Sequence, residues 1–226
     1  GDIFISEILF DPYPGGEDFV EIYNRSDKNL DLSGLQIRND QNEEIEIVED
    51  VTIPPGAYIA FSEDTDFLLQ EYKPDASANL EIQELPAFNN DEGNVMIISQ
   101  EGIVLDSFDY SEDQHFQLID DIEGVSLERI SFDIDAGDTD NWQSAAESVR
   151  FATPGYQNSN GIITVANSQN FSLLTESFSP NQDGEDDLMI LSYALQKSGF
   201  VINLNVFDAA GHKIKALSNN ELLGNQ

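Results

Sequence analysis

The feature that most constrains the fold is a succession of short apolar runs that end at turn-forming residues. Runs at 58–61, 95–98 and 104–108 are bounded by Gly, Pro, Asn and Asp. Short apolar or alternating runs with such boundaries are typical of half-buried strands, and many of them in one chain predict a β-sandwich. One stretch, 62–72, predicts a short helix instead, with Ser62 or Asp64 as N-cap and Pro74 beyond its end. We therefore expect an all-β protein.

Charge and composition exclude several classes of partner. The chain has 226 residues, 40% of them hydrophobic, which is enough to build packed cores. Asp and Glu number 44 against 9 Lys and Arg, so the formal net charge is −35. A field of this sign repels phosphate backbones, and no apolar run is long enough to span a bilayer. We expect neither nucleic-acid binding nor membrane insertion. The absence of cysteine also removes disulfides and thiolate metal sites.

Two groups of motifs stand at opposite ends of the first 160 residues. The first group is 5–12 (ISEILFDP), 18–24 (DFVEIYN) and 31–34 (DLSG), and the second is 124–130 (GVSLERI), 141–145 (NWQSA) and 152–159 (ATPGYQNS). Their order and spacing resemble the lamin tail domain of secreted bacterial proteins, over about residues 3–159. The resemblance implies an immunoglobulin-like β-sandwich that serves as an interaction module and has no recognised active site.

A second β-module is expected after a polar, turn-forming stretch at 158–161 (NSNG). We predict the sandwich over 1–160, a linker over 161–170 and a partial immunoglobulin-like module over 171–226. Within this module, 178–187 (FSPNQDGEDD) and 206–211 (VFDAAG) resemble the C-terminal module of flagellar hook-assembly and gliding-motility proteins, which closes exported surface proteins of Bacteroidetes-type bacteria. A complete sandwich needs roughly 100 residues. We therefore expect a truncated module whose uncovered strand edge favours self-association.

The search for catalytic motifs is negative. The only histidines, His115 and His212, do not share the spacing of a zinc-binding helix, and neither a nucleophile elbow nor a phosphate-binding glycine loop occurs. We expect no enzyme within these residues. His115 is interpreted as a surface or loop-anchoring residue, and Trp142 as an anchor of the core.

Two glutamates differ from the many surface acids because they lie inside strand patterns. Glu7 and Glu21 both belong to the segments that resemble the lamin tail domain. A charged carboxylate inside a sheet needs a partner that offsets its loss of hydration. Arg129 is the obvious candidate, and we predict a structural Glu–Arg pair that ties the first and last strands together.

Two acidic loops are candidate calcium sites, because calcium takes six to eight oxygen ligands and a glycine permits the sharp turn. The first loop offers Asn181, Asp183, Glu185 and Asp187, and the second offers Asp133, Asp135 and Asp138. The first resembles part of an EF-hand loop but lacks the closing glutamate. The alternative for both is a plain turn in which Asn and Asp side chains accept bonds from their own backbone. Calcium is the only cofactor that the sequence indicates.

Two functions remain compatible with the sequence. The first is a non-catalytic interaction or structural module, secreted or held at the cell surface near the outer membrane of a bacterium, that binds protein or glycan and is stabilised by calcium. The second is an accessory domain of a larger secreted hydrolase or nuclease whose catalytic part lies outside this chain.

Overall fold

The computed structural model describes residues 1–48, 50–74, 76–116 and 119–160, and beyond them the strand segments 171–173, 191–193, 200–207 and 213–223. Contacts divide the chain into two compact units, Gly1–Ile162 and Ile163–Gln226, which we treat separately. Within the described residues, no helix has both the length and the apolar character needed to cross a membrane.

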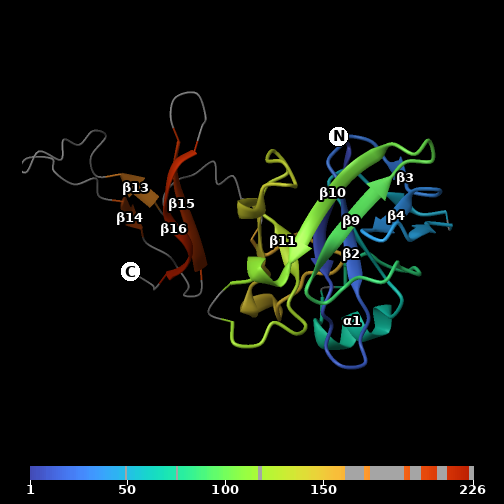
Figure 1. The fold of residues 1–226 in the computed structure, drawn as a ribbon, viewed down its shortest axis with the longest axis horizontal. Coiled ribbons are helices and arrows are strands. Elements are labelled where there is room, and N and C mark those ends of the chain that lie inside the picture. The colour runs from blue at the N-terminus through green and yellow to red at the C-terminus, as the bar shows by residue number, and fades with distance from the viewer. Residues whose placement is uncertain are drawn as a thin grey trace, which may run out of the picture. The chain divides into compact units, whose positions relative to one another are not determined.

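The first unit consists of two principal β-sheets, as the strand patterns predict (Figure 1). The six-stranded sheet has the order β12-β11-β1-β2-β7-β8 and the four-stranded sheet has the order β10-β9-β4-β5. The strands of the first sheet are β1 (Ile3–Leu9), β2 (Phe19–Asn24), β7 (Tyr58–Ser62), β8 (Leu80–Ile82), β11 (Leu127–Arg129) and β12 (Trp142–Ser144). Those of the second are β4 (Gln36–Asn39), β5 (Glu44–Glu46), β9 (Glu92–Ile98) and β10 (Val104–Ser111).

Short elements complete this unit. They are the two-stranded ribbon of β3 (Leu30–Asp31) and β6 (Thr52–Ile53), the helix α1 (Thr65–Glu71), and the 3₁₀ turns η1 (Glu112–Gln114), η2 (Thr139–Asn141) and η3 (Glu147–Val149). All strand pairs are antiparallel except β7 with β8. The fold is an all-β immunoglobulin-like sandwich, which confirms the predicted fold class.

The main core combines apolar side chains of the two sheets. Val20 and Ile22 of β2 belong to the same cluster as Val95 and Ile97 of β9, and all four are fully buried. Alternate residues of a strand point to the same face, so the period-two pattern places these pairs together. Burial of each such side chain contributes about 1.5 to 3 kcal/mol to the hydrophobic stabilisation.

A β-bulge at Ser6 shifts the register of the first strand. Ile5 pairs with Ile22 and Glu7 pairs with Glu21, so Ser6 is the extra residue on β1. Because of this insertion Ile5 and Ile8, three positions apart, both join the main core. Glu7 is placed on the opposite, outer face of the six-stranded sheet.

The outer face of the six-stranded sheet is covered as well. Leu68 of α1 and Ala152 pack in a second cluster that includes Phe19 of β2. The helix begins after Asp64, whose side chain accepts the Phe67 N–H at 2.9 Å, in agreement with one of the two predicted N-caps. The sequence predicts Phe67, Leu68 and Leu69 as the apolar side of this helix, but Leu68 is buried whereas Leu69 remains 48% exposed.

The second unit contains two antiparallel strand pairs in its described part, β13 (Phe171–Leu173) with β14 (Leu191–Tyr193) and β15 (Phe200–Phe207) with β16 (Lys213–Leu223). The apolar stretches 171–178, 188–195 and 200–207 predict three strands here, and β13, β14 and β15 lie within them, whereas β16 is not predicted. The predicted linker 161–170 lies outside the described residues. The assignment of this unit as a partial immunoglobulin-like module stays a prediction.

Candidate functional site

Three glutamates form a continuous row across adjacent strands of the six-stranded sheet. Glu21 of β2 stands opposite Glu7 of β1, and Glu7 stands opposite Glu128 of β11. All three side chains are completely buried. Residues directly opposite on neighbouring strands are close neighbours, and like charges there are destabilising. These three residues, which we call the glutamate row, are the most unusual group of titratable side chains in the described part of the chain.

Residues 152–160, which we call the strap, cover the glutamate row and bind it through hydrogen-bond donors. The Thr153 N–H donates to Glu7 Oε1 at 2.9 Å, and the Gly155 N–H donates to Glu21 Oε2 at 2.8 Å. The Ser159 N–H and hydroxyl both donate to Glu128 at 2.9 Å. Asn160 adds its backbone and side-chain N–H groups to Glu128 Oε2, each at 3.0 Å. The three carboxyls are thus the acceptors that hold the strap on the sheet.

The position of the strap depends on a close backbone approach at Gly155. This residue has a φ of 83°, and its carbonyl accepts the Asn79 N–H at 2.9 Å. A Cβ atom at this position would lie 2.6 Å from the Asn79 carbonyl oxygen. Only glycine therefore fits both the backbone conformation and the contact.

The pKa values of the row are displaced upward. Burial, followed by the Glu128 charge, raises the pKa of Glu7 from 4.5 to about 8. Burial and then the Glu7 charge raise the pKa of Glu21 well above its usual value. Burial also raises the pKa of Glu128, although the donors of Ser159, Thr153 and Asn160 oppose it. These shifts favour the neutral forms of Glu7 and Glu21, and the neutral form also suits Glu21 Oε1, which is buried without a hydrogen-bond partner.

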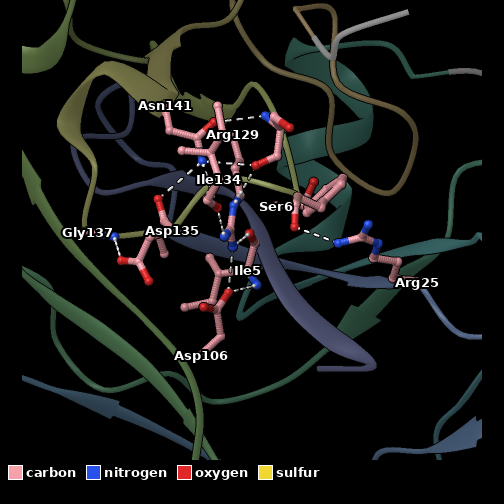
Figure 2. A network of polar contacts seen from close by, with 12 residues as sticks. Ile5, Ser6, Arg25, Asp106, Arg129, Ile134, Asp135, Gly137 and Asn141 are labelled. Atoms are coloured by element: carbon pink, nitrogen blue, oxygen red, sulfur yellow. Dashed lines mark hydrogen bonds and ion pairs between the residues drawn. The ribbon is translucent and has the colours of Figure 1, made fainter. Parts of the chain in front are cut away.

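The predicted pairing of Arg129 with Glu7 and Glu21 is wrong. Arg129 instead forms an ion pair with Asp106 of β10, with 2.8 Å between its guanidinium Nη1 and Asp106 Oδ2 (Figure 2). The reason is strand geometry, because consecutive side chains point to opposite faces of a sheet. Glu128 faces the strap, so the neighbouring Arg129 points away from it.

Arg129 is almost fully enclosed by the second acidic loop and by aromatic rings. It donates to the carbonyls of Ser131 at 3.2 Å and Ile134 at 2.8 Å. Its guanidinium carbon lies 5.2 Å from the ring centroid of Phe4 and 5.8 Å from that of Trp142. These contacts combine charged hydrogen bonds with cation–π attraction.

Asp106 completes this network at the bulge of β1. Its Oδ2 also accepts the Ile5 N–H at 2.8 Å, so one carboxylate connects β10 to both β1 and β11 (Figure 2). Burial raises the pKa of Asp106, and Arg129 opposes that rise. The pair therefore joins the two sheets at one edge of the sandwich.

The structure does not assemble Asp133, Asp135 and Asp138 into the predicted calcium site. Asp133 pairs with the exposed Arg25, Asp135 accepts the N–H of Gly137, and Asp138 accepts the N–H of Asp140. In the part of the chain that the structure describes, no three His, Cys, Asp or Glu side chains are grouped so that they could hold a metal ion. The alternative of self-bonded turns describes this loop. The other candidate ligands, Asn181, Asp183, Glu185 and Asp187, lie outside the described residues.

His115 and Trp142 have structural roles. The Ser144 hydroxyl accepts the Phe116 N–H at 2.9 Å and also forms a hydrogen bond of 2.9 Å with His115 Nδ1. Burial lowers the pKa of His115 to about 4 and keeps the ring neutral. Trp142 is 2% exposed and donates its Nε1–H to the Ala136 carbonyl at 2.8 Å. His115 anchors its loop, and Trp142 is the core residue that the sequence predicts.

Sequence reasoning missed Glu128 and Thr153. Glu128 lies in the motif 124–130 and Thr153 in the motif 152–159, but the sequence predicts no role for either residue beside Glu7 and Glu21. One signal was available, since Glu128 directly follows the apolar Leu127 inside a strand-like motif, and Glu7 and Glu21 also lie next to apolar residues in their own segments.

A surface groove lies beside the strap. It has a volume of about 510 Å³ and is lined by Thr52, Pro54, Ala57, Tyr58, Ser77, Ala78, Asn79 and Gly155. The lining offers hydroxyl and amide groups and one aromatic ring, without a charged side chain. This chemistry suits neutral polar groups.

The two sheets define the class of this protein as an immunoglobulin-like β-sandwich. More particularly, residues 1–112 match the family model of the Lamin Tail Domain. The match contains Glu7 and Glu21 and ends before Glu128 and the strap. A comparison with curated proteins gave no match. The family match does not extend to the C-terminal unit, whose resemblance to hook-assembly and gliding-motility modules stays a prediction.

Proposed function

We propose that this chain is a non-catalytic interaction module of a bacterial protein that works outside the cell or at its surface. The observation that carries the proposal is the match of residues 1–112 to the Lamin Tail Domain, an immunoglobulin-like fold. The titratable side chains are compatible with this role. The glutamate row, His115 and the Arg129–Asp106 pair all engage neighbouring protein groups rather than a reactive surface.

The groove beside the strap is the proposed contact site. Its hydroxyl, amide and tyrosine lining fits a glycan or the polar backbone of a protein segment, because such sites combine an apolar wall with a few polar groups. The net charge of −35 favours neutral or cationic partners over anionic ones. Such a surface is compatible with an extracellular location, and calcium on the loop 181–187 is part of the same proposal.

Substitution in the groove tests this function directly. Ser77 is exposed and lines the groove, so Ser77→Arg would obstruct it without a loss of core packing. Gln41→Arg adds the same charge at an exposed turn that does not line the groove and serves as the control. We expect neutral oligosaccharides of a printed panel to bind the parent and Gln41→Arg but not Ser77→Arg. Equal binding by both variants would remove the groove from the proposal.

The non-catalytic part of the proposal needs its own assay. The chain is incubated with chromogenic ester, phosphodiester and glycoside substrates, beside a Glu7→Gln variant. We expect no turnover above the uncatalysed rate. Turnover by the parent that Glu7→Gln abolishes would refute a non-catalytic module. If the chain is inactive but belongs to a larger protein with hydrolase or nuclease motifs elsewhere in its sequence, the accessory-domain alternative is favoured.

A further inference from the structure

Thr153 imposes a proton count on the glutamate row. Its Oγ1 lies 2.7 Å from Glu7 Oε2 and 2.7 Å from Glu128 Oε1. A hydroxyl has one proton to donate, whereas two ionised carboxylates can only accept. One of the two carboxyls must therefore carry a proton and donate it to Thr153, which in turn donates to the other. The three oxygens form a chain that exists only while the row holds a proton.

The distribution of donors places this proton on Glu7. Glu128 accepts from both N–H groups of Asn160 and from the N–H and hydroxyl of Ser159, which suits an ionised carboxylate. Glu7 accepts the Thr153 N–H and the Ser126 hydroxyl on Oε1, which leaves Oε2 to carry the proton. Glu21 has the Gly155 N–H on one oxygen and no partner on the other.

The surroundings of the row supply acids rather than a compensating cation. The titratable groups beside it on other elements are Tyr58 of β7 and Tyr72, the C-cap residue of α1. Burial and then the Glu21 charge raise the pKa of Tyr58, and burial raises the pKa of Tyr72, to which Tyr13 and then the Glu7 charge also contribute. Arg129, next to Glu128 in sequence, is engaged by Asp106 on the other side of the sheet. Full ionisation would therefore place three negative charges side by side on adjacent strands.

We propose that the protonation state of the glutamate row controls the strap. The strap stays bound over the sheet while the row holds protons, and it is released when the row is fully ionised; we call this arrangement the lock. Gly155 belongs to both the strap and the groove wall, so release also changes the groove. The lock goes beyond the interaction function and does not depend on it.

The direction of the pH effect follows from proton binding. An unfolded glutamate loses its proton near pH 4.5, whereas Glu7 in the folded chain has a pKa of about 8. Between these values the folded state holds protons that the unfolded state lacks, so a rise in pH favours unfolding. The stabilisation is complete below about pH 4.5 and is lost as the pH rises through about 8. For each proton that only the folded state retains, the folding equilibrium constant falls about tenfold per unit rise in pH between about pH 4.5 and about pH 8.

Hydrogen exchange of the strap amides tests the lock. The amides of Thr153, Gly155 and Ser159 are followed from pH 6 to 9, with intrinsic exchange rates corrected and the amides of β9 as an internal reference. We expect strap protection to fall about tenfold per pH unit for each retained proton up to about pH 8, to level off above that pH, and to fall more than protection in β9. Strap protection that is independent of pH would overturn the proposal.

A matched pair of variants assigns the effect to the row. Glu7→Gln retains an oxygen for the Thr153 N–H and an amide that donates to Thr153 Oγ1, but it cannot ionise. Glu46→Gln makes the same change at an exposed strand position. We expect a shallower pH dependence of strap protection in Glu7→Gln and the parental dependence in Glu46→Gln. An identical slope in both variants would contradict the lock.

Infrared absorption of a chain that retains Glu7 keeps the test decisive if Glu7→Gln does not fold. At pH 7 solvated carboxyls are ionised, but burial raises the pKa of Asp18 to about 7. In an Asp18→Asn background, a carboxylic acid carbonyl band in D₂O therefore reports a protonated group of the glutamate row. We expect this band at pH 7 and its decline above about pH 8. Its absence at pH 7 would show that the row holds no proton and would refute the proposal.

Discussion

Replacement of Arg129 by methionine removes the cation from the network that joins β1, β10 and β11. The Arg129 side chain is 2% exposed and that of Asp106 is 12% exposed, so Arg129→Met would leave a carboxylate in the interior without its charge partner. Removal of one partner from a buried pair costs about 3 to 5 kcal/mol of unfolding free energy. The loop carbonyls contribute less to this loss, because Ser131 and Ile134 keep bonds from Asn141.

Arg25→Met is the matched control for this substitution. Arg25 also lies over the Phe4 ring and also pairs with an aspartate, Asp133, but the side chains of this pair are 41% and 80% exposed. An exposed ion pair contributes about 0 to 1 kcal/mol. Urea denaturation followed by the fluorescence of Trp142 compares both variants with the parent. The reasoning is refuted if Arg129→Met is no less stable than Arg25→Met.

A second substitution tests the physical cause of the loss. Asp106→Asn keeps an oxygen that accepts the Ile5 N–H but removes the negative charge. The double variant Arg129→Met/Asp106→Asn should therefore be more stable than Arg129→Met alone, since no unpaired charge remains buried. A double variant as unstable as the sum of the two single losses would show that the buried charge is not the cause.

Three further outcomes are expected. Gly155→Ala should lower the unfolding free energy by more than about 2 kcal/mol in urea denaturation, because it adds a clash with Asn79 to the strain of a positive φ; Gly15→Ala, where the added Cβ meets nothing within 4 Å, should cost only the strain, and equal losses would contradict the contact argument. If the loop 181–187 binds calcium with a dissociation constant near 1 mM, roughly 10 mM calcium should add about 1.4 kcal/mol to the unfolding free energy in a thermal melt. Equal stabilisation by magnesium would argue against that site, and so would equal stabilisation of Asp183→Asn by calcium. Light scattering of the whole chain should show a mass that rises with concentration through self-association, and a constant monomer mass would oppose it.

The strands of the first unit and two of the three buried glutamates are predicted by the sequence, whereas Glu128 and the partners of the glutamates are not. Alternation of apolar and polar residues marks β2 and β9 without knowledge of the fold, and Glu7 and Glu21 are conspicuous because they interrupt apolar strands. The donors that satisfy them are chiefly backbone N–H groups of the strap. Every residue except proline carries such a group, so residue identity gives no signal for it.

The error at Arg129 has a related origin. Its true partner, Asp106, is one of 44 acidic residues and lies in an otherwise ordinary strand pattern. Asp106 accepts the Ile5 N–H beside the bulge at Ser6, and bulges depend on pairing between strands rather than on a local sequence pattern. The face to which Arg129 points could be deduced only after Glu128 had been placed against the strap.

The pairing of β1 with β11 has a consequence for the order of events during synthesis. Glu7 and Ile8 meet Glu128 and Leu127, and Ser6 meets Asn158, about 120 and 152 residues later in the chain. The ribosome releases the first strand long before these partners exist, and contacts of such high sequence separation form slowly. Until residue 160 has emerged, Glu7 of β1 and Glu21 of β2 remain hydrated and charged, which keeps both strands soluble before the strap covers them. The first strand of this unit to be synthesised is therefore the last to be enclosed.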